Sequence, residues 1–495
     1  MGLTDFTITN IAKSTALSPD DDKTKNKEDE ADHSHRGFSW IIASIFIVGE
    51  TAGSGMVALP AATMNAGFIG GSVLLILMCV LLGYTASLLG KNWLIMQKLW
   101  PKYKTEPCRN PYPEMGRKAM GRGAEYLVNI SSYLTLFGGM AVFSILASKN
   151  ISDLLSLFNI RVHFCIILSA LALGIWPFTM LRSPAHFWQV SIVAASATAL
   201  AVVILLVGVS IDSPMCLSEV KYSEFSLSKL SLSFGTMIFS YSGHPVLPTI
   251  QHDMKKPEHF QKAVILGYIA MFFLYAPISM LGYAVYGNSL SDTITVSIQT
   301  LVLRHIVNVM VTIHVLFSII VIGNPVLQGV EQVFKVQDKM GSGRFVVRSI
   351  IFFAAIFIAA TLPDFGIFLD LIGGSSMTIL SIILPGLFSL YLEAAEKKRE
   401  SSNDDQVAMP TFAEVIHLTP LKRLLVEFSI IAFGGLCGII CTVNTLRQIP
   451  NSSFSTPCYL DLIRGASFTN SPSLTRCCGE FHNITANSDR FFCGI

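Results

Sequence analysis

The sequence predicts an all-α membrane protein of eleven transmembrane helices, arranged as an inverted repeat of five plus five helices with one extra helix. The first observation is composition: 52% of the 495 residues are hydrophobic and only 14% are charged. The second is pattern, because the apolar residues come in runs of about 20, the length that a helix needs to cross a bilayer. The third is that two of these runs, one in each half, are broken by glycine and proline.

Eleven apolar runs mark the expected spans. Their approximate limits are 39–66, 70–96, 125–148, 163–181, 186–209, 227–250, 262–286, 300–330, 346–362, 366–392 and 425–447. Residues 1–38 are polar and of mixed charge, so we expect a disordered cytoplasmic tail and no signal peptide. The bundle then occupies 39–447, and 448–495 forms a cysteine-containing tail on the outer side.

The repeat appears when the two halves are aligned. Repeat one covers about 39–209 and repeat two about 227–392, which leaves the last run as the extra helix. The first span of each repeat is interrupted, by a G-S-G triplet at 53–55 and by S-G-H-P-V-L-P at 242–248. Because five is an odd number, the second repeat starts from the opposite side of the membrane. Inverted repeats with a broken first helix are typical of secondary transporters.

The distribution of charge predicts the orientation. With the N-terminus in the cytoplasm, 25 of the 35 Lys and Arg residues fall in cytoplasmic segments. This agrees with the positive-inside rule, so the C-terminus is expected outside or in a lumen. The net charge of +2 is too small to suggest nucleic acid as a partner. The lipid bilayer is therefore the expected environment.

Sequons and cysteines give a second marker of orientation. Three N-x-[ST] sequons on the predicted outer side are candidate glycosylation sites: Asn150, Asn451 and Asn483. Six of the ten cysteines lie on the same predicted side: Cys165, Cys216, Cys458, Cys477, Cys478 and Cys493. Disulfides suit an extracellular or lumenal compartment, and the sequence leaves their pairing open. The cysteine spacing indicates no zinc or redox motif, and no metal site is expected.

The G-S-G triplet interrupts a helix where broken hydrogen bonds cost most. In hydrocarbon every backbone N–H and C=O needs a partner, so unwound backbone persists only where it is buried in protein or lines a cavity. Unwinding here frees amides at a helix N-terminus, which attract an anionic group such as a carboxylate. The carbonyls freed by the other half-helix attract a cation. A site that offers both freed amides and freed carbonyls suits a zwitterion. The alternative is a packing motif, since small residues let transmembrane helices approach closely.

Three stretches of the chain resemble the amino acid/auxin permease family of the amino acid–polyamine–organocation superfamily: GSGMVALP at 53–60, YPEMGRKAMG at 112–121 and FGTMIFSYSGHPVLPTIQHDMKKPEHF at 234–260. The resemblance extends over about 38–447. It implies an eleven-span inverted repeat and secondary transport of amino acids, coupled to protons or sodium. Sodium-coupled members carry an asparagine shortly before the triplet, where this chain has Gly49, Glu50 and Thr51. This departure puts sodium coupling in doubt.

By position, the resemblance assigns substrate binding to two facing segments. The residues of the first broken span are Thr51, Ala52, Gly53, Ser54 and Gly55. The residues of the second are Phe239, Ser240, Tyr241, Ser242 and Gly243. The resemblance implies no cofactor apart from the coupling ion.

Two ionisable residues are candidates for proton coupling. Glu50 lies about 11 residues into the first span, roughly 16 Å deep at 1.5 Å per residue, and ionisable groups at that depth are commonly functional. His244 lies in the second break, and histidine titrates near physiological pH. The alternatives are structural: Glu50 caps freed amides or pairs with Lys91, and His244 hydrogen-bonds loosened backbone. His314 is expected to be a satisfied core histidine.

The predicted function is secondary active symport of small neutral amino acids, coupled to protons. An amino-acid sensor on the same fold, and a sodium-coupled or organellar transporter, stay open as alternatives. A divalent-metal carrier is disfavoured, because only His244 offers a suitable ligand at the breaks. An enzyme is not expected, since no nucleophile–base pair or metal motif stands out. The plasma membrane is preferred over a lysosome or vesicle, and the oligomeric state is left open.

Overall fold

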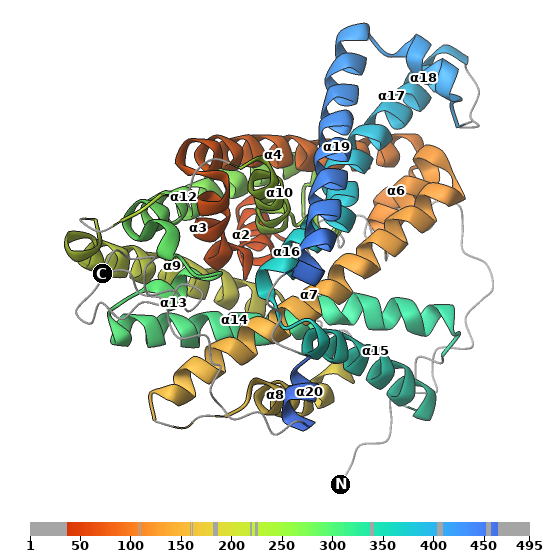
Figure 1. The fold of residues 1–495 in the computed structure, drawn as a ribbon. Helices are drawn as coiled ribbons and strands as arrows, with labels where there is room; N and C mark the ends of the chain where they lie inside the picture. The colour runs from red at the N-terminus through yellow and green to blue at the C-terminus, as the bar shows by residue number, and fades with distance from the viewer. Residues whose placement is uncertain are drawn as a thin grey trace.

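The computed structural model describes residues 37–106, 108, 110–158, 160, 162–181, 187–217, 220–222, 226–336, 341–402, 409–451 and 457–463. Across these residues the chain is helical throughout (Figure 1), and the single strand-like pairing among them is a parallel bridge between Phe38 and Met254. The expected all-α architecture is confirmed. The predicted N-terminal tail and most of the predicted outer tail lie outside the described residues.

The predicted spans coincide with long apolar helices. Eight such segments are α4 (Phe68–Leu99), α7 (Arg122–Ser156), α9 (Phe187–Cys216), α12 (Phe260–Tyr286), α14 (Leu301–Val333), α15 (Ser342–Thr361), the segment that runs from α16 into α17, and α19 (Leu421–Asn451). A ninth span is the bent pair α2 (Trp40–Thr51) and α3 (Gly55–Ala66). The remaining two predicted spans fall on the shorter α8 (Phe164–Thr179) and on the pair α10 (Leu227–Tyr241) and α11 (Leu247–His252). A helix or a broken helix therefore stands at each of the eleven predicted places.

Span 10 departs from a regular α-helix. It begins as α16 (Phe365–Ile372), continues through two π-helical segments, η3 (Gly373–Met377) and η4 (Ile379–Ile383), and ends as α17 (Leu384–Ser402). Short helices in the connecting segments are α5 (Lys102–Thr105), α6 (Pro111–Met120), η1 (Pro257–His259), η2 (Gly287–Ser289), α13 (Ile294–Ser297), α18 (Phe412–Leu418) and α20 (Cys458–Ile463). Single π-helical turns are rare and occur frequently at functional sites.

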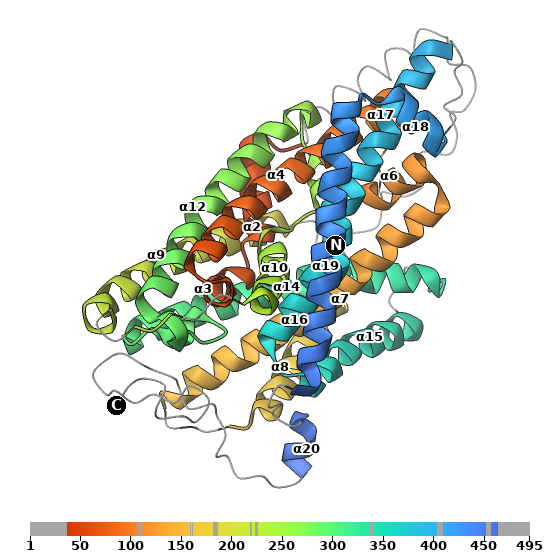
Figure 2. The same ribbon diagram turned by 45° about the horizontal axis from the view of Figure 1, so that its top comes forward.

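The contacts between helices repeat from one half of the chain to the other. In repeat one α2 packs against α9, and in repeat two α10 packs against α16. Across the halves α2 contacts α12 just as α10 contacts α4, and α7 and α14 cross beside them (Figures 1 and 2). These matched pairs are those of an inverted repeat of five plus five helices. The extra helix α19 lies on the outside of this arrangement, against α10 and α16.

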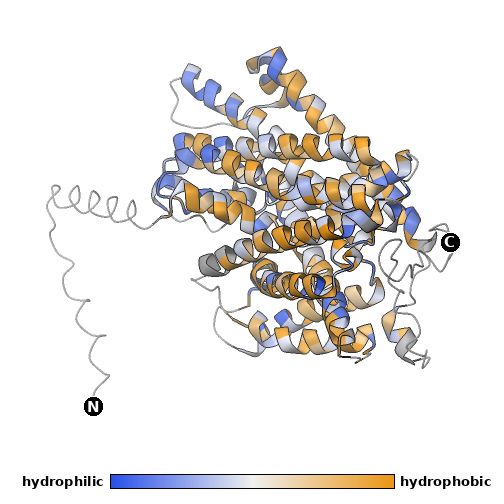
Figure 3. Cartoon of the chain, turned by 90° about the vertical axis from the view of Figure 1, so that its left-hand side faces the viewer, coloured by the Kyte–Doolittle hydropathy of each residue, from blue (hydrophilic) through white to orange (hydrophobic). Residues whose placement is uncertain are grey.

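The surface of the bundle is apolar where lipid would surround it. Large aliphatic and aromatic side chains are exposed along the spans, among them Ile69, Val80 and Phe273. Figure 3 shows apolar residues along the lengths of the helices, with hydrophilic residues gathered mainly toward their ends. This distribution places the apolar side chains in lipid and the charged ones near water, as a multi-pass membrane protein requires.

The short α8 is capped at its C-terminal end by a neighbouring span. The last carbonyls of a helix have no partners within the helix itself. The buried guanidinium of Arg348, on α15, donates to the carbonyls of Thr179 at 2.6 Å and Leu181 at 2.9 Å. The same guanidinium is paired with Glu331 of α14 at 2.6 Å. Spans 4, 8 and 9 are thereby joined at one point, and a 16-residue helix is sufficient there.

Ion pairs join α4 to α17 on the predicted inner side. Lys91 Nζ lies 2.6 Å from Glu393, and Lys98 Nζ lies 2.6 Å from Glu396. The alternative in which Lys91 pairs with Glu50 is therefore wrong. The physical reason is geometry along α4: Lys91 lies two turns from its end, where the lysine side chain reaches water and α17.

Disulfides involve cysteines that were predicted to be on the outer side. Cys165, near the start of α8, is bonded to Cys458 of α20, and Cys216 at the end of α9 is also disulfide-bonded. The free cysteines of the described residues lie within spans or on the predicted inner side: Cys79, Cys108, Cys437 and Cys441. The other three cysteines of the outer tail fall outside the described residues.

The sequon at Asn150 is not accessible to a glycan. Its side chain lies within α7 and is 3% exposed, with Nδ2 buried and unpaired. Glycosylated sequons lie on accessible surface segments, so the prediction for Asn150 is wrong. The error arose because α7 extends to Ser156, beyond the expected end of span 3. Asn451 is the last residue of α19 and Asn483 lies outside the described residues, so both stay predictions.

Candidate functional site

The first break takes only three residues. α2 ends at Thr51 and α3 begins at Gly55, and the two half-helices are bent by 62° relative to one another. Ser54 occupies the N-cap position of α3, but its side chain makes no capping hydrogen bond. The cap therefore leaves amides of the first turn of α3 to other acceptors. A helix N-terminus in this condition favours a negatively charged partner.

The second break, at 242–246, faces the first. Pro245 has no N–H to donate, so it cannot continue the hydrogen-bond ladder of α10. Gly243 has a different role, because a Cβ there would lie 2.6 Å from Thr51 Oγ1. The missing side chain lets the two breaks approach within van der Waals contact. The helix resumes at Leu247, with Pro248 in its first turn, where proline is tolerated.

Hydroxyl groups from neighbouring spans satisfy the carbonyls that the breaks expose. Tyr275 of α12 places its hydroxyl 3.0 Å from Ser240 O and 3.3 Å from Thr51 O, and so bridges the two broken helices. Two further hydroxyls act on the next carbonyls: Tyr268 on Tyr241 O at 3.0 Å, and Thr198 on Ala52 O at 3.0 Å. The carbonyls that were expected to attract a cation thus already accept hydrogen bonds, which restricts the cation-binding capacity of the breaks.

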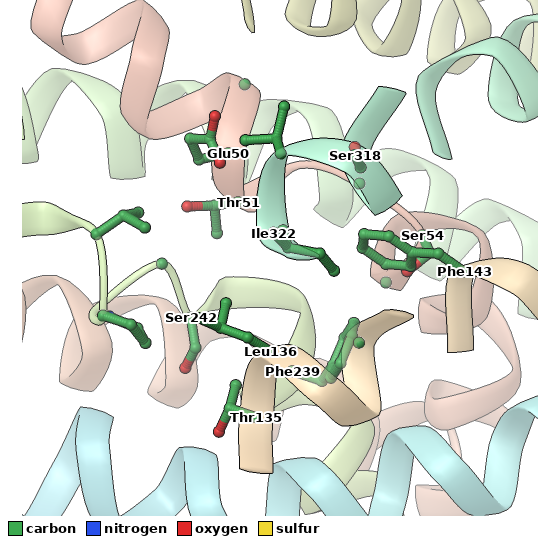
Figure 4. A pocket seen from close by; sticks show the side chains of 18 of the residues that line it. Glu50, Thr51, Ser54, Thr135, Leu136, Phe143, Phe239, Ser242, Ser318 and Ile322 are labelled. Carbon is green, nitrogen blue, oxygen red and sulfur yellow. The ribbon is translucent and has the colours of Figure 1, made fainter. Parts of the chain in front are cut away.

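A cavity of about 80 Å³ lies between the two breaks. A single water needs roughly 10–15 Å³ on this kind of measure, so the space admits a small solute and is more than a packing defect. Figure 4 shows side chains of four spans around it: Glu50, Thr51 and Ser54 from the first broken span, Thr135, Leu136 and Phe143 from α7, Phe239 and Ser242 from the second broken span, and Ser318 and Ile322 from α14. Ala194 of α9 and Met377 of η3 also belong to the lining.

Within the part of the chain that the structure describes, three hydroxyls on the cavity wall have no hydrogen-bond partner. They belong to Thr51, Ser54 and Ser242, and each oxygen is buried. Buried polar atoms in folded proteins are nearly always hydrogen-bonded, so unpaired ones call for an explanation. Here all three oxygens belong to side chains that line one cavity, and two of them flank the first break. The arrangement can bind a ligand that carries hydrogen-bonding groups.

One part of the cavity wall is apolar. Phe143 and Phe239 meet edge to face with their ring centroids 6.5 Å apart. Ile322 approaches α7 so closely that a Cβ on Gly139 would lie 3.0 Å from its terminal methyl group. Leu136 lines the cavity on the same side. This wall suits a short aliphatic side chain and offers no charged partner to a longer polar one.

Eight of the twelve predicted substrate and coupling residues line the cavity: Glu50, Thr51, Gly53, Ser54, Gly55, Phe239, Ser242 and Gly243. The other four predicted residues are absent from the lining. The carbonyl of Ala52 accepts a hydrogen bond from Thr198, Ser240 lies against Gly55, and Tyr241 packs its ring on Tyr275 at 4.9 Å. His244 is buried and turned toward α4, with Nε2 3.0 Å from Thr85 Oγ1.

His314 was expected to be a satisfied core histidine; it is buried and hydrogen-bonded, and it also lines the cavity. Its Nδ1 lies 3.3 Å from Thr198 Oγ1 and 3.4 Å from Ala194 O, which fixes the ring against α9. Its Nε2 faces the first break, since a Cβ on Gly53 would lie 3.0 Å from it. The rotation of α14 decides which side chains face the breaks, and the sequence of this apolar span gives no signal of that rotation.

On the predicted outer side the cavity is closed by direct packing of α3 against α10. Ser233 Oγ donates to Ala62 O at 2.7 Å, and a Cβ on Gly55 would lie 2.6 Å from Ser240 Cα. Other lining residues, such as Glu50 and Pro245, lie on the predicted inner side of the breaks. The described conformation is therefore closed toward the predicted outer side.

Comparison with known sequences identifies relatives among membrane transporters. The family profile described as "Transmembrane amino acid transporter protein" matches residues 36–419. "Amino acid transporter AVT1J" from Arabidopsis thaliana is 26% identical over 362 residues, which are 70% of this chain and 80% of that protein. "Amino acid transporter AVT1B" from the same plant is 24% identical over 410 residues, covering 80% of this chain and 68% of that protein.

Comparison with solved structures supports the fold. MhsT, solved in complex with L-phenylalanine, has a TM-score of 0.50 at 13% identity and covers 83% of this chain and 100% of its own. The inward-facing conformation of Mhp1 has a TM-score of 0.51 at 11% identity, over 85% of this chain and 92% of its own. At these identities the likeness concerns the helical architecture alone.

Proposed function

Because the chain belongs to the transmembrane amino acid transporter family, we propose that it is a secondary active symporter that moves small neutral amino acids together with protons. The observation that carries the proposal is the cavity between the two breaks, with its three unpaired hydroxyls and its apolar wall. The protein is an integral multi-pass membrane protein of an amino acid transporter family. The direction of coupling, the ion and the size of the substrate are the parts proposed.

The substrate carboxylate is proposed to lie at the N-terminus of α3. The unused amides of the first turn and the positive end of the helix dipole favour an anion there. Ser54 Oγ stands beside those amides without a partner and can donate to the same carboxylate. Among the described residues no lysine or arginine lines the cavity, so the helix terminus itself supplies the positive potential.

The ammonium group is proposed to lie between Thr51 and Ser242. Both hydroxyl oxygens are unpaired acceptors on facing breaks, and each neighbouring carbonyl keeps a second lone pair. The side chain of the substrate then extends toward Phe143, Phe239 and Ile322. These walls leave room for a small apolar group only, which supports small neutral amino acids as substrates.

Protons are proposed as the coupling ion, with Glu50 as the exchanging group. Glu50 lines the cavity on its predicted inner side, where a proton can reach it along the same path as the substrate. A carboxyl in such a position can be neutral or charged according to its surroundings. His244 stays a candidate, but its position against Thr85 keeps it apart from the cavity.

The proposed orientation places the N-terminus in the cytoplasm. The bond between Cys165 and Cys458, and the disulfide at Cys216, support it, because disulfides persist in oxidising compartments and all three cysteines lie at the predicted outer ends of their segments. The plasma membrane is preferred to an organelle on the grounds of the sequence alone.

The test is uptake of a labelled amino-acid panel into proteoliposomes, with an imposed pH gradient and with sodium removed. We expect the native protein to concentrate small neutral amino acids along the proton gradient without sodium. Glu50→Gln is expected to keep exchange of internal for external substrate and to lose the response to the pH gradient, because an amide cannot carry a proton.

The matched control is Glu258→Gln, which makes the same change on an exposed residue beyond the second break. It is expected to behave like the native protein. Uptake that requires sodium would overturn the proposed coupling and keep the substrate class. Binding of amino acids without any flux would replace the transporter proposal by a sensor.

A further inference from the structure

One buried carboxyl in the bundle has no part in the site described so far. Asp370 lies near the end of α16, and 7% of its side chain is exposed. Its Oδ1 accepts two hydrogen bonds from one residue of α10, at 3.1 Å from the backbone N–H of Thr236 and at 2.5 Å from its hydroxyl. Across the part of the chain that the structure describes, no basic side chain forms an ion pair with Asp370.

The charged groups around Asp370 do not favour its ionisation. Asp364 at the start of α16 and Asp292 before α13 are the acidic groups near enough to act on it, and both carry like charge. The nearest basic group in that cluster is Lys149 of α7, which lies 4.0 Å from Asp292. From α19 the facing titratable group is Cys441, whose thiol points at the Asp370 carbonyl at 3.5 Å. An unpaired carboxylate taken out of water is strongly penalised, and two hydrogen bonds from one threonine offset that penalty only in part.

The position of Asp370 links two spans whose backbones touch. A Cβ on Gly235 of α10 would lie 2.5 Å from Asp370 O, and a Cβ on Gly373 would meet the Gly235 carbonyl even more closely. The π-helical segments η3 and η4 follow directly, and η3 also packs against α10, so span 10 loses its regular hydrogen bonding at its contact with α10. Span 6 reaches the substrate cavity one turn beyond Thr236, at Phe239. A change at Asp370 therefore acts on a helix that lines the cavity.

We propose that Asp370 is a second proton-exchanging group, which is protonated when α10 and α16 are packed together and ionises when they separate toward the outer side. In the packed arrangement burial disfavours the charged form, whereas separation lets water reach the carboxylate. The packed form then binds the proton more tightly, so it is favoured at low pH and is lost as the pH rises. As a step in transport this rests on the proposed function: a proton taken from the outer side closes the outer entrance over the substrate.

The first test uses Cys441 as a native reporter, because its thiol lies at the contact of α10, η3 and α19. The purified, reconstituted protein is treated from the outer side with a membrane-impermeant thiol reagent at pH 6 and pH 8, and the signal of Cys441→Ser is subtracted. We expect labelling of the native protein to rise with pH beyond the ordinary ionisation of a thiol. In Asp370→Asn we expect labelling to be at least about fivefold lower at pH 8, since a single titrating group changes populations by up to tenfold per pH unit.

The expected decrease in labelling of Asp370→Asn cannot come from a direct electrostatic effect of Asp370 on the Cys441 thiol. Removing a negative charge near Cys441 favours its thiolate and by itself would increase labelling, whereas the proposal requires a decrease. Equal or increased labelling in Asp370→Asn would overturn the proposal. If that variant fails to fold, Thr236→Val serves instead, because it keeps the carboxyl and removes one donor to its charged form. It should shift the midpoint of the labelling curve to higher pH, and an unchanged midpoint would overturn the proposal.

Uptake separates this inference from the proposed function. In proteoliposomes with the inner and outer pH kept equal, so that no gradient acts through Glu50, native exchange of internal for external substrate is expected to fall at least about fivefold when the pH is raised by two units, and exchange by Asp370→Asn less than twofold. Native transport with the same pH response in Asp370→Asn would overturn the inference and leave the proposed function intact. Labelling that depends on Asp370 in a protein that moves no amino acid would support the inference and refute the proposed function.

Discussion

The two breaks occupy equivalent places in the inverted repeat, yet they differ in what they offer the cavity. The first takes three residues and directs Glu50, Thr51 and Ser54 into it. The second takes five residues and contributes one side chain with a hydroxyl, Ser242, while His244 turns away toward α4. The second half-helix after the break also differs, with 12 residues in α3 and six in α11.

Because of this difference, the two halves of a symmetric inverted repeat present different groups to the cavity, as an asymmetric ligand would require. The repeat places two unwound segments face to face, which neither segment could achieve alone in lipid. The local sequence of each unwound segment then decides which side chains it contributes to the cavity. The first broken span provides most of the polar groups, whereas the second provides Ser242, the ring of Phe239 and the close backbone approach at Gly243. A zwitterion with one apolar substituent has the same asymmetry, so the comparison itself supports the proposed substrate class.

The largest effect is expected where the two broken helices touch. Gly55→Ala would place a Cβ 2.6 Å from Ser240 Cα, and backbone cannot move aside as a side chain can. We expect loss of at least about 90% of uptake and a destabilisation of about 1–3 kcal/mol from overpacking. Uptake and thermal unfolding measure the two effects.

Two further glycines sharpen this prediction. Gly243→Ala meets only the Thr51 hydroxyl, so it should cost less than Gly55→Ala. Gly174→Ala on α8 has nothing within 4 Å and should behave like the native protein. Native uptake by Gly55→Ala would show that the two breaks are not in rigid contact.

An intermediate effect is expected at the hydroxyl that bridges the breaks. Tyr275→Phe leaves the carbonyls of Ser240 and Thr51 without that donor, in a region that water does not easily reach. We expect the protein to be destabilised by about 1–3 kcal/mol, seen as a lower Tm. Tyr268→Phe is the matched control, because it removes a donor from one carbonyl only. A larger loss in the control than in Tyr275→Phe would contradict the bridging role.

The smallest effect is expected at Thr51, and it should have opposite signs for stability and binding. Its hydroxyl has no hydrogen-bond partner among the described residues, so Thr51→Val should leave Tm unchanged or raised. The same change should weaken substrate binding by about 1–1.5 kcal/mol, or roughly tenfold in KM. Thermal unfolding with and without substrate, beside uptake kinetics, checks both signs. A lower Tm with an unchanged KM would make the hydroxyl structural and move the binding site elsewhere.

Much of the fold could be predicted because glycine, proline and apolar length act locally. The runs of apolar residues and the interruptions at 53–55 and 242–248 are legible one segment at a time, and both breaks lie where the sequence placed them. Helix ends were less predictable. α7 runs past the expected limit of its span to Ser156, because polar residues such as Lys149 and Asp153 continue the helix and find partners in the protein.

The site was predicted only in part because side-chain direction depends on helix rotation and on distant contacts. Glu50 and Thr51 could be assigned, since they adjoin the break itself. His244 also adjoins a break, but Thr85 of α4 provides its hydrogen bond and turns it away. His314 faces the cavity through the packing of α14 on α9. Asp370 gave no sequence signal, because a single aspartate near a predicted helix end resembles an interfacial residue.

The bond between Cys165 and Cys458 also has a consequence for biosynthesis. Its partners are 293 residues apart, so it closes only after nearly the whole chain has left the ribosome. In the proposed orientation α20 must also have reached the lumen, which requires the preceding spans to be inserted in the correct order. The formation of this disulfide therefore marks the completion of membrane insertion. A thiol-trapping time course during synthesis would measure when this point is reached.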